Sequence, residues 1–198
     1  MKTRVAQQIL AYAASQPEGT PLTAKGVLHL GTRAAVDQGL SRLSRAGKLL
    51  RTGRGMYVLP VTGRFGVRPP LSDRVVAEAA KVRGETIAPH GVAAANRLGL
   101  TTQIPMRATY LTSGRSRQFM LGAQQIELQH APPWQLLHIG RESGEILRAI
   151  AWSGRSRARE LLAKLMPTLT KDTTAELLAS RSSLPGWLAE SIGVELTA

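Results

Sequence analysis

The chain has 198 residues and carries 26 Lys and Arg against 13 Asp and Glu, which gives a formal net charge of +13. It contains no cysteine, so disulfides and cysteine-based zinc sites are excluded. No apolar run approaches the roughly 18 residues of a membrane-spanning helix, and the first residues lack the apolar core of a signal peptide, so we expect a cytoplasmic protein.

Residues 1–46 carry the apolar spacing of three helices, over 3–15, over 23–30 and over 32–46. Thr23 and Thr32 begin the second and third of these segments, where a threonine side chain can cap the free amides of a helix. In the third helix the apolar residues lie at i, i+4 and i+7, as Val36, Leu40 and Leu43. The polar residues of that helix are therefore expected on its opposite face.

A basic hairpin is predicted directly after the third helix. Residues 48–51 and 56–59 have the pattern of short strands, with a turn over 52–55 that contains two glycines. Three helices followed by a hairpin are typical of a winged helix-turn-helix. The predicted fold class is α+β, with this domain over residues 1–62, a linker over 63–70 and a mixed domain over 71–198.

The third helix and the hairpin carry the side chains that suit duplex DNA. Arg can donate two hydrogen bonds to guanine and Gln can pair with adenine, so Arg33, Gln38 and Arg42 are the candidates for base contacts. Thr32 and Ser41 are expected to position the helix. Asp37, four residues after Arg33, is expected to orient it. Contacts to the phosphates are expected from the remaining basic residues, which are Arg45, Lys48, Arg51 and Arg54.

The distribution of charge supports this prediction. Residues 1–70 contain eleven Lys or Arg and two acids, giving +9, whereas residues 71–198 contain fifteen bases and eleven acids, giving +4. A partner that is a polyanion would favour such a concentration. The alternatives are a winged helix that contacts only proteins, and an arginine-rich composition without a nucleic-acid partner.

The second domain is predicted to combine a small antiparallel sheet with helices. Strand patterns lie over 86–88, 108–112, 118–121 and 125–129. Helical patterns lie over 72–82, 90–98, 142–152, 155–165 and 171–179, and a last helix follows Pro185. The three tryptophans are expected in the core or at an interface, and they are Trp134, Trp152 and Trp187.

Residues with catalytic or metal-binding spacing are absent from the sequence. The four histidines have no partner at i+3 or i+4, and Glu127 is the only acid on the predicted strands over 108–129. Neither a nucleophile elbow nor a phosphate-binding loop occurs. We therefore expect no enzyme, no cofactor and no metal, with a magnesium-dependent nuclease as the less favoured alternative.

Five segments together resemble the AbiEi-like antitoxins of abortive-infection, type IV toxin–antitoxin systems. They are residues 32–43, the GRGMYVLP segment at 53–60, AANRLGL at 94–100, YLTSG at 110–114 and LPGW at 184–187. The resemblance spans nearly the whole chain. It implies an N-terminal winged helix-turn-helix whose DNA-contacting residues correspond to Arg33, Arg42, Arg45 and Arg54.

What the resemblance implies about function is a phage-defence antitoxin that is also a transcriptional repressor. The N-terminal domain would bind inverted repeats in its own promoter. The C-terminal domain would counteract a cognate nucleotidyltransferase-like toxin, directly or indirectly, and assist repression. The alternative is a stand-alone winged-helix regulator whose C-terminal domain binds a ligand or dimerises.

Overall fold

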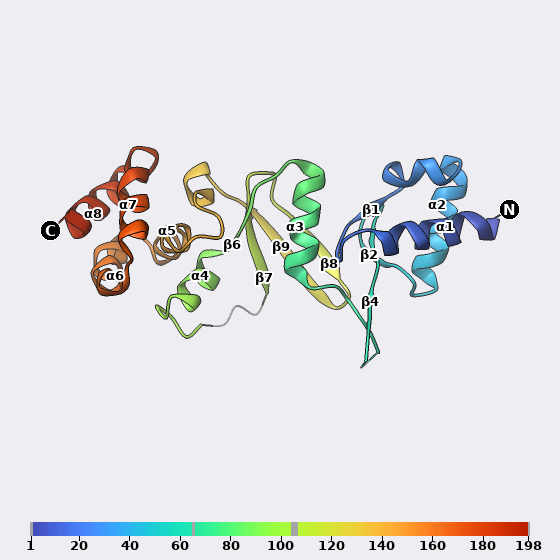
Figure 1. Ribbon diagram of the computed structural model, residues 1–198, viewed down its shortest axis with the longest axis horizontal. Coiled ribbons are helices and arrows are strands. Elements are labelled where there is room, and N and C mark those ends of the chain that lie inside the picture. The colour runs from blue at the N-terminus through green and yellow to red at the C-terminus, as the bar shows by residue number, and fades with distance from the viewer. Residues whose placement is uncertain (1, 65, 104–106, 198) are drawn as a thin grey trace. The chain divides into compact units, whose positions relative to one another are not determined.

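The computed structural model describes residues 2–64, 66–103 and 107–197, and Figure 1 labels its α-helices and most of its strands. The chain is an α+β protein with small antiparallel sheets and a series of C-terminal helices, as the sequence predicts. It divides into two compact units. The first consists of residues 1–85 and 117–127, and the second of residues 86–116 and 128–198.

Three helices open the first unit: α1 (Lys2–Ser15), the 3-10 helix η1 (Lys25–Leu30) and α2 (Arg33–Arg45). The predicted cap at Thr32 forms, since its Oγ1 accepts from the Ala35 amide at 3.4 Å. At η1 the N-cap is Ala24 rather than the predicted Thr23, although Thr23 Oγ1 still accepts from the Gly26 amide at 3.1 Å. The second segment is 3-10 rather than α-helical, and Val27 leaves helical backbone angles there.

The core of this part is aliphatic and lies between α1, η1 and α2. Gly39 belongs to the buried face of α2, where an added Cβ would come within 3.0 Å of Ile9 Cδ1, so the two helices pack closely. Full burial of a side chain such as Leu40 contributes about 1.5–3 kcal/mol. The buried residues are Ala6, Ile9, Ala13, Leu22, Val27, Val36, Leu40, Leu43, Leu49 and Tyr57.

One strand before α2 and two strands after it form a three-stranded sheet, in the order β1-β3-β2. Its strands are β1 (Leu22–Thr23), β2 (Leu50–Gly53) and β3 (Met56–Val58), and β1 pairs antiparallel with β3. The first strand of the hairpin was predicted over 48–51 but begins at Leu50. The reason is that the amides of Lys48 and Leu49 donate to the Leu43 carbonyl at 2.9 and 3.2 Å, which ends α2 instead.

The segment predicted as a linker over 63–70 forms part of a hairpin. Strands β4 (Val61–Gly63) and β5 (Gly66–Arg68) pair antiparallel, with Thr62 opposite Val67. Val67 is 67% exposed, so neither face of this hairpin produces the apolar alternation by which a strand is predicted. The amide of Leu71 then donates to Glu18 Oε1 at 3.2 Å.

Helix α3 (Ser72–Arg83) completes the helices of the first unit. It packs against the turn after α1, because a Cβ at Gly19 would lie 2.8 Å from the backbone of Arg74 and Val75. The boundary between the compact units falls after Glu85, which differs from the predicted boundaries at 62 and 71. The predicted domain boundaries stay a prediction.

The predicted strands of the chain's middle are present and form a sheet with the order β6-β7-β9-β8. They are β6 (Ile87–Pro89), β7 (Ala108–Thr112), β8 (Arg117–Leu121) and β9 (Gln124–His130). Helix α4 (Gly91–Arg97) follows β6. It packs directly on α5 (Glu142–Ser153), since a Cβ at Gly91 would lie 2.3 Å from the Arg148 carbonyl oxygen.

The end of the second unit is helical and encloses its own aliphatic core. After the 3-10 turn η2 (Pro133–Leu136) and α5 come η3 (Arg155–Arg157), α6 (Ala158–Leu165), η4 (Met166–Thr168), α7 (Lys171–Ala179), η5 (Ser180–Ser183) and α8 (Gly186–Thr197). The buried residues are Ile146, Leu147, Ile150, Ala158, Leu161, Leu162, Leu165, Leu177, Leu188 and Ile192. The three tryptophans pack against the cores of this unit, as predicted.

Glu176 on α7 ties that helix to the start of α5. Its carboxylate accepts from Ser143 Oγ at 2.5 Å and pairs with the guanidinium of Arg141. The hydrogen bond from Ser143, followed by that from Arg141, lowers the pKa of Glu176 below its usual value. This carboxylate is therefore a titratable part of the α5–α7 packing.

Candidate nucleic-acid interface

Helix α2 has two faces of different chemistry. Val36, Gly39, Leu40 and Leu43 are buried against the first unit's core. The remaining side chains along the helix are exposed or half-buried, and a shallow open hollow of about 420 Å³ lies over them. The described residues that line this hollow all belong to α2, and they are Asp37, Gln38, Ser41, Arg42 and Arg45.

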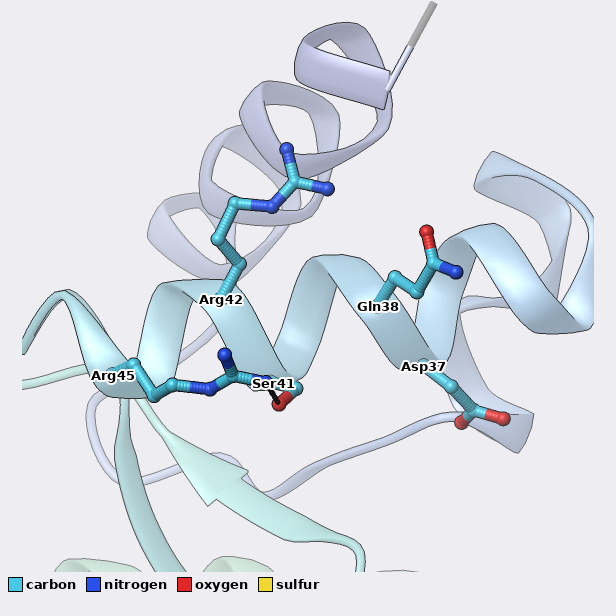
Figure 2. A pocket seen from close by; sticks show the side chains of 5 residues that line it. All are labelled: Asp37, Gln38, Ser41, Arg42 and Arg45. Carbon is cyan, nitrogen blue, oxygen red and sulfur yellow. Dashed lines mark hydrogen bonds between the residues drawn. The ribbon is translucent and has the colours of Figure 1, made fainter.

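Gln38 and Arg42 project from the same side of α2, while Asp37 points to a different side (Figure 2). The spacing of four residues explains this arrangement, because side chains at i and i+4 share a helix face. Within the part of the chain that the structure describes, no hydrogen bond or ion pair engages the side chain of either Gln38 or Arg42. Their donors and acceptors are consequently available to a partner.

The other two arginines of α2 are held by neighbours on the helix. Arg33 Nε donates to Asp37 Oδ2 at 2.8 Å, which confirms the predicted pairing at i−4. Both side chains are more than half exposed, so this ion pair contributes little to stability. Arg45 Nη2 donates to Ser41 Oγ at 3.0 Å, and that bond directs the Arg45 side chain back along the helix (Figure 2).

The basic residues after α2 lie at its end and around the β2–β3 hairpin, and all are exposed. Lys48 follows the last turn of α2. Arg51 Nε donates to the Gly53 carbonyl at 3.3 Å, which places its side chain beside the turn. Arg54 occupies the turn itself next to Gly55, whose φ of +68° suits glycine.

The interior of the hairpin is fixed by a buried threonine. Thr52 is 2% exposed, and its Oγ1 donates to the Met56 carbonyl at 3.3 Å, at the irregularity between Arg51 and Gly53. Strand β3 also pairs with β1, where Leu22 lies opposite Tyr57, so β3 has a partner strand on both of its edges. These contacts hold the hairpin in place. Strand β1 was not predicted from the sequence because it has only two residues.

The nine predicted site residues occupy one segment of the chain, residues 32–54. In the structure, two of them also stabilise the helix or a neighbouring side chain. Thr32 caps α2 and Ser41 accepts from Arg45. The other seven are exposed at their positions. Nothing in the structure tests their contact with DNA, which stays a prediction.

The histidines take part in local packing and hydrogen bonding. His29 meets the Tyr12 ring edge-on at a centroid distance of 5.1 Å. His90 caps α4, His130 Nδ1 bonds the Gly114 carbonyl and His138 Nε2 bonds Ser180 Oγ. Among the described residues no group of three or more His, Asp or Glu is placed to hold a metal ion. None of the described helices is long and apolar enough to cross a membrane.

Comparison with known protein families finds a match over most of the chain. Residues 8–178 match a protein family described as a family of unknown function, DUF6088. The chain belongs to the DUF6088 family. This match includes α2, the β2–β3 hairpin and most of the second unit, so both units are part of what the family shares. No curated protein and no solved structure matches the chain.

Proposed function

We propose that this DUF6088 protein is a winged helix-turn-helix transcriptional repressor that binds duplex DNA through α2 and the β2–β3 hairpin. The observation that carries the proposal is the one-sided burial of α2. Its apolar side chains are inside the unit, while Gln38 and Arg42 stand unengaged on the outer side within the described chain. A helix that presents Arg and Gln in this way suits the floor of the major groove.

The dimensions of α2 fit that task. A helix of 13 residues is about 20 Å long at 1.5 Å per residue, and its width matches a major groove of roughly 12 Å. With α2 in the groove, Gln38 and Arg42 read base edges. Arg33 shares its charge with Asp37, so it contributes to base contact only if that ion pair opens.

The hairpin and the end of α2 supply the contacts to the backbone. The positively charged side chains there are those of Arg45, Lys48, Arg51 and Arg54, and the chain contains no acid from residue 38 to residue 54. Such contacts to phosphate add affinity on every sequence and make it dependent on salt. Binding to inverted repeats would place two copies of the chain on one operator.

The setting we propose is a toxin–antitoxin operon in the cytoplasm. It is supported by the resemblance of residues 32–43, 53–60, 94–100, 110–114 and 184–187 to AbiEi-like antitoxins. In that setting the second unit counteracts a nucleotidyltransferase-like toxin encoded beside this gene, and the protein itself is not an enzyme. Growth rescue upon co-expression with the adjacent gene tests this part alone.

DNA binding is tested with the full chain and a duplex that covers the promoter upstream of its gene. Arg42→Ala is expected to cost about 1–3 kcal/mol in fluorescence anisotropy and to lower the preference for the promoter over a shuffled duplex. Arg155→Ala, an exposed arginine of the second unit, is the matched control and should bind as the parent does. If Arg42→Ala keeps both affinity and preference, α2 is not the recognition helix.

A further inference from the structure

The β4–β5 hairpin is exposed on both of its faces. Each strand has three residues, and Val61 is the only one of the six that is even half-buried. Val67, an apolar residue, is 67% exposed. A lone two-stranded hairpin is at best marginally stable in water, and burial of these residues adds little to stability. Contact with a partner therefore explains this hairpin better than a role in folding.

The base of the hairpin is held in place, although its strands are exposed. Arg68 Nη1 donates to the Pro69 carbonyl at 3.0 Å and lies 3.8 Å from Glu18 Oε1. Pro70 is buried, and the amide of Leu71 donates to Glu18 Oε1 at 3.2 Å. Figure 1 shows β4 in a narrow ribbon that extends away from β1 and β2. The hairpin thus combines a fixed base with a projecting tip.

One face of the hairpin carries no side chain near its tip. Gly63 lies opposite Gly66, on the same face as the pair of Val61 and Arg68 nearer the base. A side chain would fit at Gly63, since its Cβ would lie 3.9 Å from the Gly66 carbonyl oxygen, an ordinary contact distance. Glycine in a strand often marks a place where another molecule approaches the backbone closely.

The charge of the hairpin favours a polyanion as that molecule. The chain contains no acid from residue 38 to residue 72. Arg64 directly follows Gly63 and is exposed. It takes part in an interaction within the chain. Its guanidinium has five N–H donors and keeps its charge, so that interaction does not prevent contact with DNA.

The two hairpins of the first unit can reach the same duplex. Gly55, in the turn of the β2–β3 hairpin, immediately precedes β3, and Val61 follows the end of β3 by three residues. Six residues span at most about 20 Å, and the length of the β4–β5 hairpin adds about 10 Å. The two tips are therefore at most about 30 Å apart, which is less than one turn of duplex DNA, roughly 34 Å.

We propose that the β4–β5 hairpin places Arg64 in the minor groove of the duplex, within about one helical turn of the base pairs that α2 reads. Such a contact rests on the DNA binding proposed for α2 and the β2–β3 hairpin. The minor groove is only about 6 Å wide, so the absence of side chains at Gly63 and Gly66 lets the tip approach its rim. Arginine is attracted to this groove where A·T base pairs make it narrow and its potential more negative.

The experiment measures binding of the full chain to the promoter duplex by fluorescence anisotropy. The base pairs on either side of the segment whose preference Arg42→Ala abolishes are changed block by block to A·T, to G·C or to inosine·cytosine. An inosine·cytosine pair presents the major-groove acceptors of G·C but lacks the amino group that guanine places in the minor groove.

We expect one flanking block in which G·C weakens binding by at least about 5-fold relative to A·T, the lower end for a wrong base pair. Inosine·cytosine should restore the affinity in that block, because the contact lies in the minor groove. If no flanking block shows this pattern, the proposal is wrong.

A charge variant links the pattern to the hairpin. Arg64→Gln should bind the three versions of that block equally. Arg83→Gln removes the same charge from an exposed position at the end of α3 in the same unit, and it should discriminate among them as the parent does. Discrimination by Arg64→Gln that equals that of the parent would show that another residue occupies the groove.

A second variant tests the shape of the tip without a change in charge. Gly63→Val should fold, because its Cβ has room and valine is favoured in strands, but its side chain should hold the tip away from the groove. Discrimination should then be lost. Thr62→Val, on the opposite face, is the control and should bind as the parent does. Unchanged discrimination in Gly63→Val would contradict the close approach.

Two outcomes separate this contact from DNA binding itself. If the full chain binds no duplex, both the proposed function and the minor-groove contact are wrong. If Arg42→Ala loses the preference for the promoter while no flanking block responds, α2 reads the DNA and only the contact by Arg64 is refuted.

Discussion

The salt dependence of DNA binding gives the sharpest test of the β2–β3 hairpin as a wing. Arg54 lies in its turn, exposed and distant from the buried face of α2. We assign four phosphate contacts to each chain, from Arg45, Lys48, Arg51 and Arg54. At about −0.9 per phosphate, the slope of log affinity against log salt is then about −3.6 per chain.

Arg54→Gln removes one of these charges and retains a polar side chain of related length. The slope should flatten to about −2.7 per bound chain. Doubling the salt concentration then weakens binding by roughly 6-fold in the variant, compared with roughly 12-fold in the parent. Base preference should stay the same, because a phosphate contact carries no sequence information.

The assay is fluorescence anisotropy of the promoter duplex over a series of potassium chloride concentrations. Arg155→Gln, outside the first unit, is the control and should reproduce the parent slope. An Arg54→Gln slope equal to that of the parent would refute the assignment of the hairpin to the DNA backbone. A parent slope near zero would refute electrostatic DNA binding altogether.

Two further predictions concern the stability of the second unit. Gly91→Ala places a Cβ 2.3 Å from the Arg148 carbonyl and should lower the free energy of unfolding by about 1–3 kcal/mol in urea titrations, whereas Gly186→Ala, with open space around it, should be neutral or slightly stabilising. Glu176→Gln removes a carboxylate whose pKa is lowered first by the hydrogen bond from Ser143. The variant should therefore be less stable than the parent above pH 4.5, and the difference in the free energy of unfolding should vanish as the pH falls through the lowered pKa. A difference from the parent that is constant from neutral to acid pH would contradict this.

The sequence predicts elements whose burial is one-sided. In α2 the stripe of Val36, Leu40 and Leu43 fixes both the helix and its outer face, and the cap at Thr32 fixes where it begins. Strand β7 lies at its predicted residues, Ala108–Thr112, although its last three residues are all buried. In such elements the spacing of apolar residues shows which face is buried, so they can be predicted without knowing which element packs against them.

Other features depend on contacts between distant residues and leave no local pattern. Strand β1 has two residues and is defined only by its pairing with β3. The β4–β5 hairpin has exposed faces, so its pairing rests on backbone hydrogen bonds and leaves no hydrophobic pattern in the sequence. Arg148 is one arginine in a basic chain, and its burial arises from the packing of α4 and η2 around α5.

The outer side of α2 has a consequence for how such proteins diversify. Because Gln38 and Arg42 take no part in the core of the first unit, exchanges at these two positions should leave folding unchanged. Under the proposed repressor function, operator preference could therefore change by substitution at these two positions without loss of stability. Two such chains that differ there would each bind their own promoter and not that of the other.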